Sequence, residues 1–196
     1  MKKSKFNMQI KINVPDGKSG NYEVETFTVR EDDARLMRIR SIFGSGRGLI
    51  QPGEYKKLKR DGVMVMSNAP DEIRDFMPFV HRSRGSVLVN GLGLGVLLRA
   101  LLAKDEVEEV TVIEKSADVI KLVAPTYAHD KRLTIIHADA FEYKPPKGKR
   151  YNCVWHDIWD TICSDNLPEM KTLHRKYGRC SDFQLSWCRR ECEARR

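Results

Sequence analysis

The sequence predicts an α/β protein in which a doubly wound parallel sheet follows a smaller β-rich region. From Gly85 onward, short apolar runs alternate with helical patterns, as they do in such sheets. The first apolar run breaks into the glycine-rich turn 91–95. Before residue 80 the pattern instead repeats every second residue, which is typical of strands. We therefore expect a β-rich region with short helices over 1–80 and an α/β domain over 81–196.

Turn signals divide the first region into short elements. Asp16-Gly17 and Ser19-Gly20 predict one hairpin, and Asp61-Gly62 predicts a second. Glu31 opens a segment whose early acids suit the positive end of a helix dipole. The elements predicted here are strands at 6–14, 22–29, 54–59 and 63–66, and helices at 31–42 and 71–80.

The glycines of 43–48 have a spacing that could suit a phosphate cradle. No strand leads into this stretch, however, and Pro52-Gly53 follows where a helix would be needed. We interpret it as a flexible connection.

The second region reads as alternating strands and helices. We predict strands at 86–90, 110–114, 133–137 and 151–156, and helices at 96–104, 117–127 and from within 164–169 to Tyr177. Residues 181–195 fit either a last strand or a charged terminal helix, and periodicity does not choose between them. Either way the sheet is shortened at its C-terminal end, which leaves an edge that a second copy could cover in a homodimer.

Composition excludes several classes of protein. The 196 residues are 41% hydrophobic, which is enough for a globular core and too much for a disordered chain. No apolar run has the roughly 18 to 20 residues of a membrane span, and the chain starts without the pattern of an export signal. We therefore expect no membrane partner and a cytoplasmic location.

The net charge of +8 favours an acidic partner only weakly. The 35 Lys and Arg residues are dispersed along the chain, and the basic tract 144–150 is most simply a solvated loop. A nucleic-acid partner would be better supported by basic residues interleaved with aromatic residues on one element.

The cysteines favour neither disulfides nor a metal. All 5 lie in the last quarter of the chain, an odd number in a cluster that fits a reducing compartment. Cys188 and Cys192 have helical spacing, but no second short-spaced pair completes a zinc site. We expect small buried side chains and surface thiols, and no metal.

The most informative stretch is the run 87–89 followed by Asn90 and the turn 91–95. Glycines after a buried strand let the backbone bend sharply and approach a ligand closely. The spacing is G-x-G-x-G, with Val96 where a dinucleotide-binding turn has its third glycine, so nicotinamide and flavin cofactors are disfavoured. Glu114 ends the next predicted strand about 20 residues later, where an acid can accept hydrogen bonds from ribose hydroxyls.

Further candidates follow the third and fourth predicted strands of this region. Asp139, flanked by apolar residues, could accept from the exocyclic amine of adenine, although an Asp after a strand is also a common turn former. His156 could be a general base or a structural histidine. Trp155 and Trp159 could stack on a planar substrate or enclose a cation, and we expect one of them to serve in packing.

In these motifs the sequence resembles the class I S-adenosylmethionine-dependent methyltransferases, and more closely their spermidine synthase branch. The resemblance rests on the segments LKRDGVMVMSNAPDEIRDF, VLVNGLGLGVLLRALL, VTVIEKSADVIKL, IIHADAFEY and YNCVWHDIWD, which occur in the order of that branch's motifs. It implies a Rossmann-like methyltransferase sheet and S-adenosylmethionine as the cofactor.

The resemblance also implies roles for individual residues. The glycine turn would line the amino acid part of the cofactor, Glu114 would hold the ribose, and Asp139 with Ala140 would meet the adenine. The D-I-W-D stretch matches the branch's D-x-x-D motif, whose first acid acts on the nucleophilic amine. The residues expected to bind the cofactor are Asn90, Gly91, Leu92, Gly93, Gly95, Glu114, Lys115, Asp139, Ala140 and Asp157, and the catalytic candidates are Asp157, Asp160 and His156.

Two departures from the branch argue against polyamine chemistry. Leu94 stands where the synthases carry an acid, and their Tyr-His pair is missing from the segment EIRDF. A multiply charged cation is costly to desolvate without several carboxylates. We expect a methyltransferase whose acceptor the sequence does not name, with an aminopropyltransferase and a non-catalytic cofactor-binding protein as alternatives.

Overall fold

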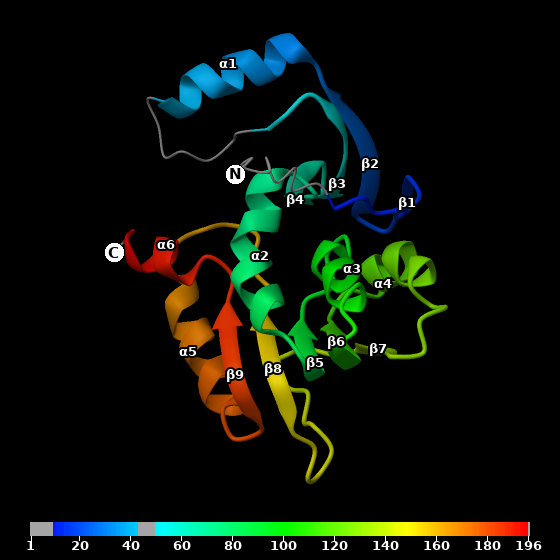
Figure 1. Cartoon of the computed structure of the whole chain (residues 1–196), viewed down its shortest axis with the longest axis vertical. Coiled ribbons are helices and arrows are strands. Elements are labelled where there is room, and N and C mark those ends of the chain that lie inside the picture. Colours follow the sequence, from blue (N-terminus) through cyan, green and yellow to red (C-terminus); the bar gives the residue numbers. More distant parts are fainter. Residues whose placement is uncertain (1–9, 43–49, 196) are drawn as a thin grey trace, which may run out of the picture.

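Two sheets organise residues 10–42 and 50–195, the part of the chain that the computed structural model describes (Figure 1). The antiparallel sheet has the order β1-β2-β3-β4, with β1 (Gly17–Ser19), β2 (Tyr22–Val29), β3 (Gly53–Arg60) and β4 (Val63–Ser67). The parallel sheet has the order β7-β6-β5-β8-β9, with β5 (Gly85–Asn90), β6 (Val107–Glu114), β7 (Leu133–His137), β8 (Tyr151–His156) and β9 (Ser181–Ser186). This architecture confirms the predicted α/β class.

Helices cover both faces of the parallel sheet, which confirms that it is doubly wound. The helices are α1 (Glu31–Ile42), α2 (Pro70–Arg82), α3 (Val96–Leu102), α4 (Ala117–Val123), the short 3₁₀ helix η1 (Ala124–Thr126), α5 (Asn166–Tyr177) and α6 (Arg189–Glu193). Buried side chains of α2, α3 and α4 form one core cluster with Val87 and Val89 of β5. On the opposite face, Leu173 and Tyr177 of α5 pack against Leu88.

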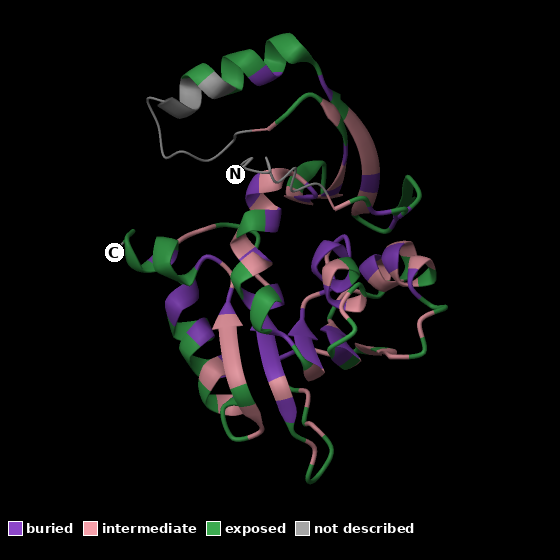
Figure 2. Cartoon of the chain, in the orientation of Figure 1, coloured by how far each residue is buried: buried purple, intermediate pink, exposed green. Residues whose placement is uncertain are grey.

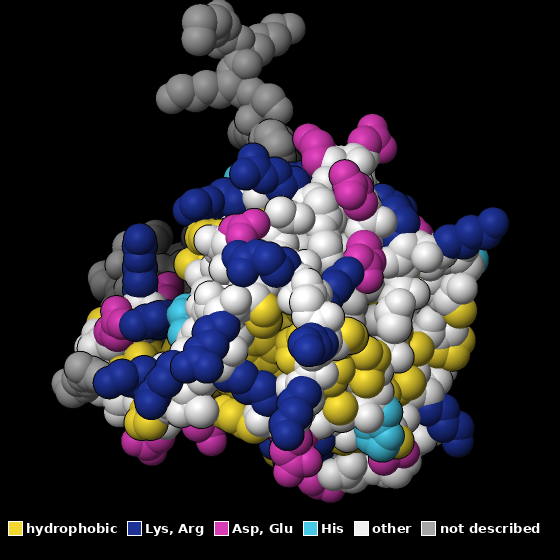
Figure 3. All heavy atoms as spheres, turned by 90° about the horizontal axis from the view of Figure 1, so that it is seen from below, with side chains coloured by type: hydrophobic (Ala, Val, Ile, Leu, Met, Phe, Trp, Pro, Cys, Tyr) yellow, Lys and Arg dark blue, Asp and Glu magenta, His cyan; other side chains and the backbone are white. Residues whose placement is uncertain are grey.

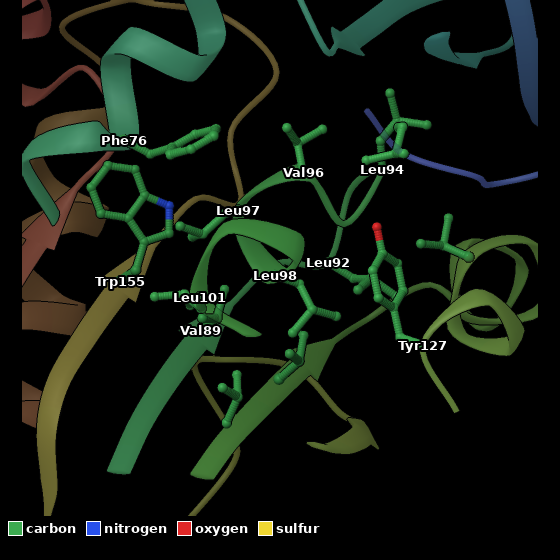
Figure 4. Packing of buried hydrophobic residues seen from close by; sticks show 14 of the residues in the cluster. Phe76, Val89, Leu92, Leu94, Val96, Leu97, Leu98, Leu101, Tyr127 and Trp155 are labelled. Carbon is green, nitrogen blue, oxygen red and sulfur yellow. The ribbon is translucent and has the colours of Figure 1, made fainter. Parts of the chain in front are cut away.

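The central strands are buried, as their continuous apolar sequence predicts. Figure 2 shows β5 and β8 mostly in the colour of buried residues, while α1 is largely exposed. In the close view of Figure 4, Leu97 lies beside Trp155, and Tyr127 lies near the start of α3. The same cluster includes Val24 and Leu58 of the antiparallel sheet, so the two sheets share one hydrophobic core.

The second hairpin forms where Asp61-Gly62 predicts it. Both residues have positive φ, 52° and 79°, as the tight turn between twisted antiparallel strands requires. β2 pairs along its whole length with β3, which pairs in turn with β4. The C-terminal end of β4 therefore lies close to α2 and to the parallel sheet.

Some predicted boundaries are wrong for identifiable reasons. Residues 10–14 alternate between exposed and buried but form no strand, and the first hairpin is instead β1 with β2. The helix predicted over 117–127 changes to 3₁₀ geometry at Ala124 because Pro125 lacks an amide N–H and crowds the preceding turn. Residues 181–195 form both the strand and the helix that the sequence offered as alternatives. Residues 6–9 and the glycines of 43–48 lie outside the described part.

Candidate functional site

A cavity of about 620 Å³ opens at the carboxyl ends of β5, β6 and β8. Ligands of open α/β sheets bind at this end, next to the point where the strand order reverses. The cavity is lined by the turn after β5, the end of β6 and the segments after β7 and β8, and also by β3, β4 and the first turn of α2. The cavity thus lies between the two sheets.

The turn after β5 needs glycine because other parts of the chain approach it closely. Gly91 has φ of 100°, and a Cβ there would lie 2.0 Å from the backbone oxygen of Asp157. Gly93 has φ of 50°, and its Cβ would lie 2.3 Å from the Sδ of Met66. The amide of Leu94 donates to that same sulfur over 3.1 Å. The hairpin β3-β4 therefore reaches over the glycine turn.

Glu114 lies in the cavity wall and is joined to the glycine turn. One carboxylate oxygen accepts from the amide of Leu92 over 2.8 Å, and the other accepts from the amide of Ser116 over 2.7 Å. Each carboxylate oxygen has a further lone pair, so a hydroxyl in the cavity can still donate to it. These two bonds fix the carboxylate beside the turn.

Asp139 and Ala140 follow β7 and also line the cavity. Asp139 accepts from the amide of Phe141 and pairs with the ammonium of Lys115, each over 2.8 Å. The hydrogen bond from Lys115, followed by that from Phe141, holds the pKa of Asp139 below its usual range. Its carboxylate is therefore a stable acceptor. Lys115 itself is exposed, with 78% of its side chain accessible.

Asp157 and Asp160 lie at the end of the cavity beyond β8. Burial raises the pKa of Asp157 to about 7, and a weak hydrogen bond from the indole of Trp155, 3.4 Å long, opposes the change only in part. Asp160 instead forms an ion pair with Arg60 of β3. Asp157 can therefore exchange a proton near neutral pH, whereas the charge of Asp160 is balanced by Arg60.

Three of the residues predicted from the sequence do not line the cavity. Gly95 faces Tyr127, whose hydroxyl donates to the Gly95 carbonyl over 3.0 Å. Asn90 and His156 are fully buried and bond to each other over 2.8 Å, while the other ring nitrogen of His156 lies 3.1 Å from Gln184. Burial lowers the pKa of His156 to about 3. This geometry gives His156 the surroundings of a structural histidine and not of a base that meets a ligand.

The first region supplies cavity residues that the sequence reasoning missed. Tyr22, Arg60 and Met66 come from the antiparallel sheet, and Glu72 comes from the first turn of α2. Glu72 stands in a pattern typical of a helix start, and this pattern gives no sign that its side chain lines a cavity. The approach of the hairpin to the glycine turn is a long-range contact with no local signal.

All 3 tryptophans of the sequence line the cavity. Trp155 is 1% exposed and packs on Phe79, with 5.2 Å between ring centroids. Trp159 donates its indole N–H to Glu169 over 2.7 Å. Trp187 follows β9 and completes the set. This part of the cavity therefore combines aromatic faces with carboxyl groups.

The described residues provide no other chemistry of the kinds considered from the sequence. Within 10–42 and 50–195, no three His, Cys, Asp or Glu side chains are grouped to hold a metal ion. The cysteines are thiols. No helix in these ranges combines the length and apolar character of a membrane span.

Comparisons with known proteins give structural likeness only. No family model and no curated protein matches the sequence. Among solved structures, spermidine synthase from Thermotoga maritima is similar over 86% of this chain and 52% of its own, at 16% identity and a TM-score of 0.48. DhpI in complex with SAH is similar over 58% of this chain and 56% of its own, at 16% identity and a TM-score of 0.43. N-methyltransferase NodS from Bradyrhizobium japonicum WM9 is similar over 55% and 61%, at 11% identity and a TM-score of 0.43. The chain thus spans between about half and three fifths of the length of these proteins.

Proposed function

We propose that the protein is an S-adenosylmethionine-dependent methyltransferase. One observation carries the proposal: Glu114 is hydrogen-bonded to the Leu92 amide of a glycine turn, in the wall of a cavity at the carboxyl ends of the parallel strands. A turn rich in glycine lets a ligand come close to its backbone, and a fixed carboxylate beside it can accept from a pair of ribose hydroxyls.

The residues present fit the cofactor in three places. Gly91, Leu92 and Gly93 would face its amino acid part, where a Cβ at either glycine would collide with neighbouring atoms. Glu114 would hold the ribose. Asp139 would accept from the adenine amine, with Ala140 beside the ring. S-adenosylmethionine supplies a methyl group that its sulfonium has already activated.

The chain's own task is then mainly one of positioning. Transfer of an activated methyl group needs alignment and exclusion of water more than it needs acid or base catalysis. Trp155, Trp159 and Asp157 lie on the cavity wall where an acceptor would meet the methyl group. A carboxylate there can hold an acceptor nitrogen and remove its proton. Asp157 is therefore the residue to which we assign catalysis, with Asp160 and its partner Arg60 bordering the same space.

Methyl transfer is favoured over aminopropyl transfer by the surroundings of Leu94. Its side chain is 0% exposed and belongs to the hydrophobic core, so the turn has no acid to hold a polyamine. A nucleic-acid acceptor gains no support from the face of the molecule that Figure 3 shows. In Figure 3, Lys and Arg side chains are spread over the face with Asp and Glu among them.

The test is analysis of the products. The purified protein is incubated with S-adenosylmethionine and a pool of small amines, and in parallel with decarboxylated S-adenosylmethionine and putrescine. Methyl transfer yields S-adenosylhomocysteine in the first mixture, which is the expected result. Methylthioadenosine in the second mixture would establish the aminopropyltransferase, and tight cofactor binding without either product would favour the non-catalytic protein.

A further inference from the structure

Glu72 contributes a further carboxyl group to the cavity that Asp157 lines. It belongs to the first turn of α2 and lines the cavity together with Asp157. One of its oxygens, Oε1, accepts from both the amide and the hydroxyl of Ser67, each over 2.9 Å. The side chain is thereby anchored by a single oxygen.

Helix capping accounts for only one of the two oxygens of the Glu72 carboxyl group. A Glu in the first turn that accepts from an amide just before the helix is a common stabilising arrangement. That role uses Oε1 and would be served equally by the amide oxygen of Gln. It requires neither a second oxygen nor an acid in the wall of a cavity.

Within the described part of the chain, no cation that lines the cavity is left to neutralise the two carboxyl groups. Among the described residues that line the cavity, the cations are Arg60 and Lys115. Arg60 is paired with Asp160, and Lys115 is paired with Asp139. Burial, helped by the nearby Asp157 and Asp75, raises the pKa of Glu72 to about 7 against the two hydrogen bonds from Ser67. Two carboxyl groups in such a place need either a shared proton or a cationic ligand.

We propose that Glu72 and Asp157 act as one carboxyl pair that binds the acceptor as an ammonium ion and takes up the proton that its nitrogen must lose. This rests on the proposed methyltransferase function and narrows the acceptor to a basic amine. The proton passes from the ammonium to a carboxylate oxygen of the pair. The freed nitrogen lone pair then forms the bond to the methyl carbon as the carbon–sulfur bond breaks, and its electrons go to the sulfur. The tryptophan faces of the same cavity suit a cation as well.

Other titratable groups lie near the pair and are kept unchanged in the test. Asp75 lies one turn further along α2 and accepts from the thiol of Cys188 over 3.2 Å. Asp160 and Arg60 lie across the cavity as an ion pair, and Tyr22 lies beside Arg60. None of them is changed in the variants below.

Tryptophan fluorescence can report the pair without any cofactor. All 3 tryptophans line the cavity, and the indole of Trp155 donates to Asp157. The wild-type signal should change over a broad range around pH 7, because two coupled groups release their protons in overlapping steps. Glu72→Gln keeps the helix cap and should leave a narrower transition at lower pH. Asp157→Asn should abolish the part of the change that Trp155 reports.

Asp71→Asn is the matched control. Asp71 lies next to Glu72 on α2 but does not line the cavity. Its titration curve should coincide with that of the wild type. If Glu72→Gln also titrates like the wild type, Glu72 is a helix cap only and the proposal is wrong.

Ligand binding tests the acceptor class with two probes of the same shape. Benzylamine, as its ammonium, should quench the tryptophans at a concentration about tenfold lower than benzyl alcohol, since only the cation gains a charged hydrogen bond. Glu72→Gln should lose most of this preference. Equal binding of the two probes by the wild type would overturn the proposal. Calorimetry with S-adenosylmethionine is done on the same samples, so a protein that fails to bind the cofactor contradicts the proposed function while the titration still tests the pair.

Discussion

The carboxyl groups on two walls of the cavity differ in their hydrogen-bond partners and in the charges beside them. On the wall formed by β6 and β7, Glu114 is held by two backbone amides and Asp139 by an amide and Lys115. On the wall formed by β8 and α2, Asp157 and Glu72 have no cationic partner among the residues that the structure describes, and burial raises the pKa of each to about 7. The carboxyl groups of Asp and Glu are therefore fixed hydrogen-bond acceptors on one wall and proton-exchanging groups on the other.

This difference follows from the backbone more than from the side chains. The turns after β5, β6 and β7 supply the amides that hold these carboxylates, since strand ends and tight turns leave N–H groups without a partner in the sheet. Around Asp157 the neighbours are Trp155 and the first turn of α2, which contribute apolar surface and further acids. We infer that the first wall is built to hold a ligand and the second to react with one.

The largest expected effect comes from removing the acid of the reactive wall. Asp157→Asn should lower turnover by about 10² to 10⁴-fold, the usual contribution of a positioned general base. Its affinity for S-adenosylhomocysteine should stay close to that of the wild type. Steady-state kinetics and calorimetry measure the two quantities separately. Asp182→Asn, at the amino end of β9, should leave both unchanged, and equal turnover in Asp157→Asn would remove Asp157 from the mechanism.

The next effect tests how closely the segment after β8 approaches the glycine turn at Gly91. A Cβ on Gly91 would lie 2.0 Å from the backbone oxygen of Asp157, so Gly91→Ala must displace the main chain. We expect a loss of about 2 to 4 kcal/mol in the free energy of unfolding. Gly148→Ala is the control, because Gly148 also has positive φ, 81°, but nothing lies within 4 Å of its Cβ position. Its cost should be about 1 kcal/mol, that of the backbone strain alone. Equal losses in urea denaturation would contradict the close approach.

A smaller effect concerns the stability of the fold as a function of pH. The pKa values of Asp157 and Glu72 rise from 3.8 and 4.5 to about 7 in the folded protein. Their neutral forms therefore favour the fold, and this stability is fully present below about pH 4 and is lost as the pH rises through 7. Between pH 5 and pH 8 the melting temperature of the wild type should fall by about 5 °C more than that of Glu72→Gln. If the melting temperature of the wild type falls no more steeply with pH than that of Glu72→Gln, ionisation of Glu72 does not destabilise the fold.

The smallest effect belongs to the exposed ion pair of the first wall. Lys115 is 78% exposed, so its pair with Asp139 is well screened by water. Lys115→Ala should reduce cofactor affinity by less than about 0.5 kcal/mol. The amide of Phe141 still holds Asp139 in place. A loss ten times larger in calorimetry would mean that Lys115 itself contacts the ligand.

The residues that the sequence predicts well are those whose environment is local. The glycine turn, Glu114, Asp139 and Asp157 all lie at the end of a strand or within two residues of it, and strand ends of a parallel sheet meet at one edge. Their presence in one cavity therefore follows from the order of elements. The hairpin at Asp61-Gly62 is equally local, since only its two central residues need positive φ.

The residues that the sequence predicts poorly depend on contacts across the chain. Glu72 has the pattern of a helix start, and its place in the cavity arises only from the packing of α2 beside β8. His156 is the last residue of β8 and precedes Asp157, but the alternation of the strand turns it to the opposite face, where Asn90 and Gln184 bind it. Met66 reaches Gly93 through the pairing of β4 with β3.

The most direct test of the account is calorimetric titration of the wild type and Glu114→Ala with S-adenosylhomocysteine. Glu108→Ala serves as control, because Glu108 lies on the same strand and is exposed. We expect binding by the wild type and the control, and an affinity lower by about 1 to 3 kcal/mol in Glu114→Ala through lost charged hydrogen bonds. Equal affinity of all three proteins, or no binding by the wild type, would contradict it.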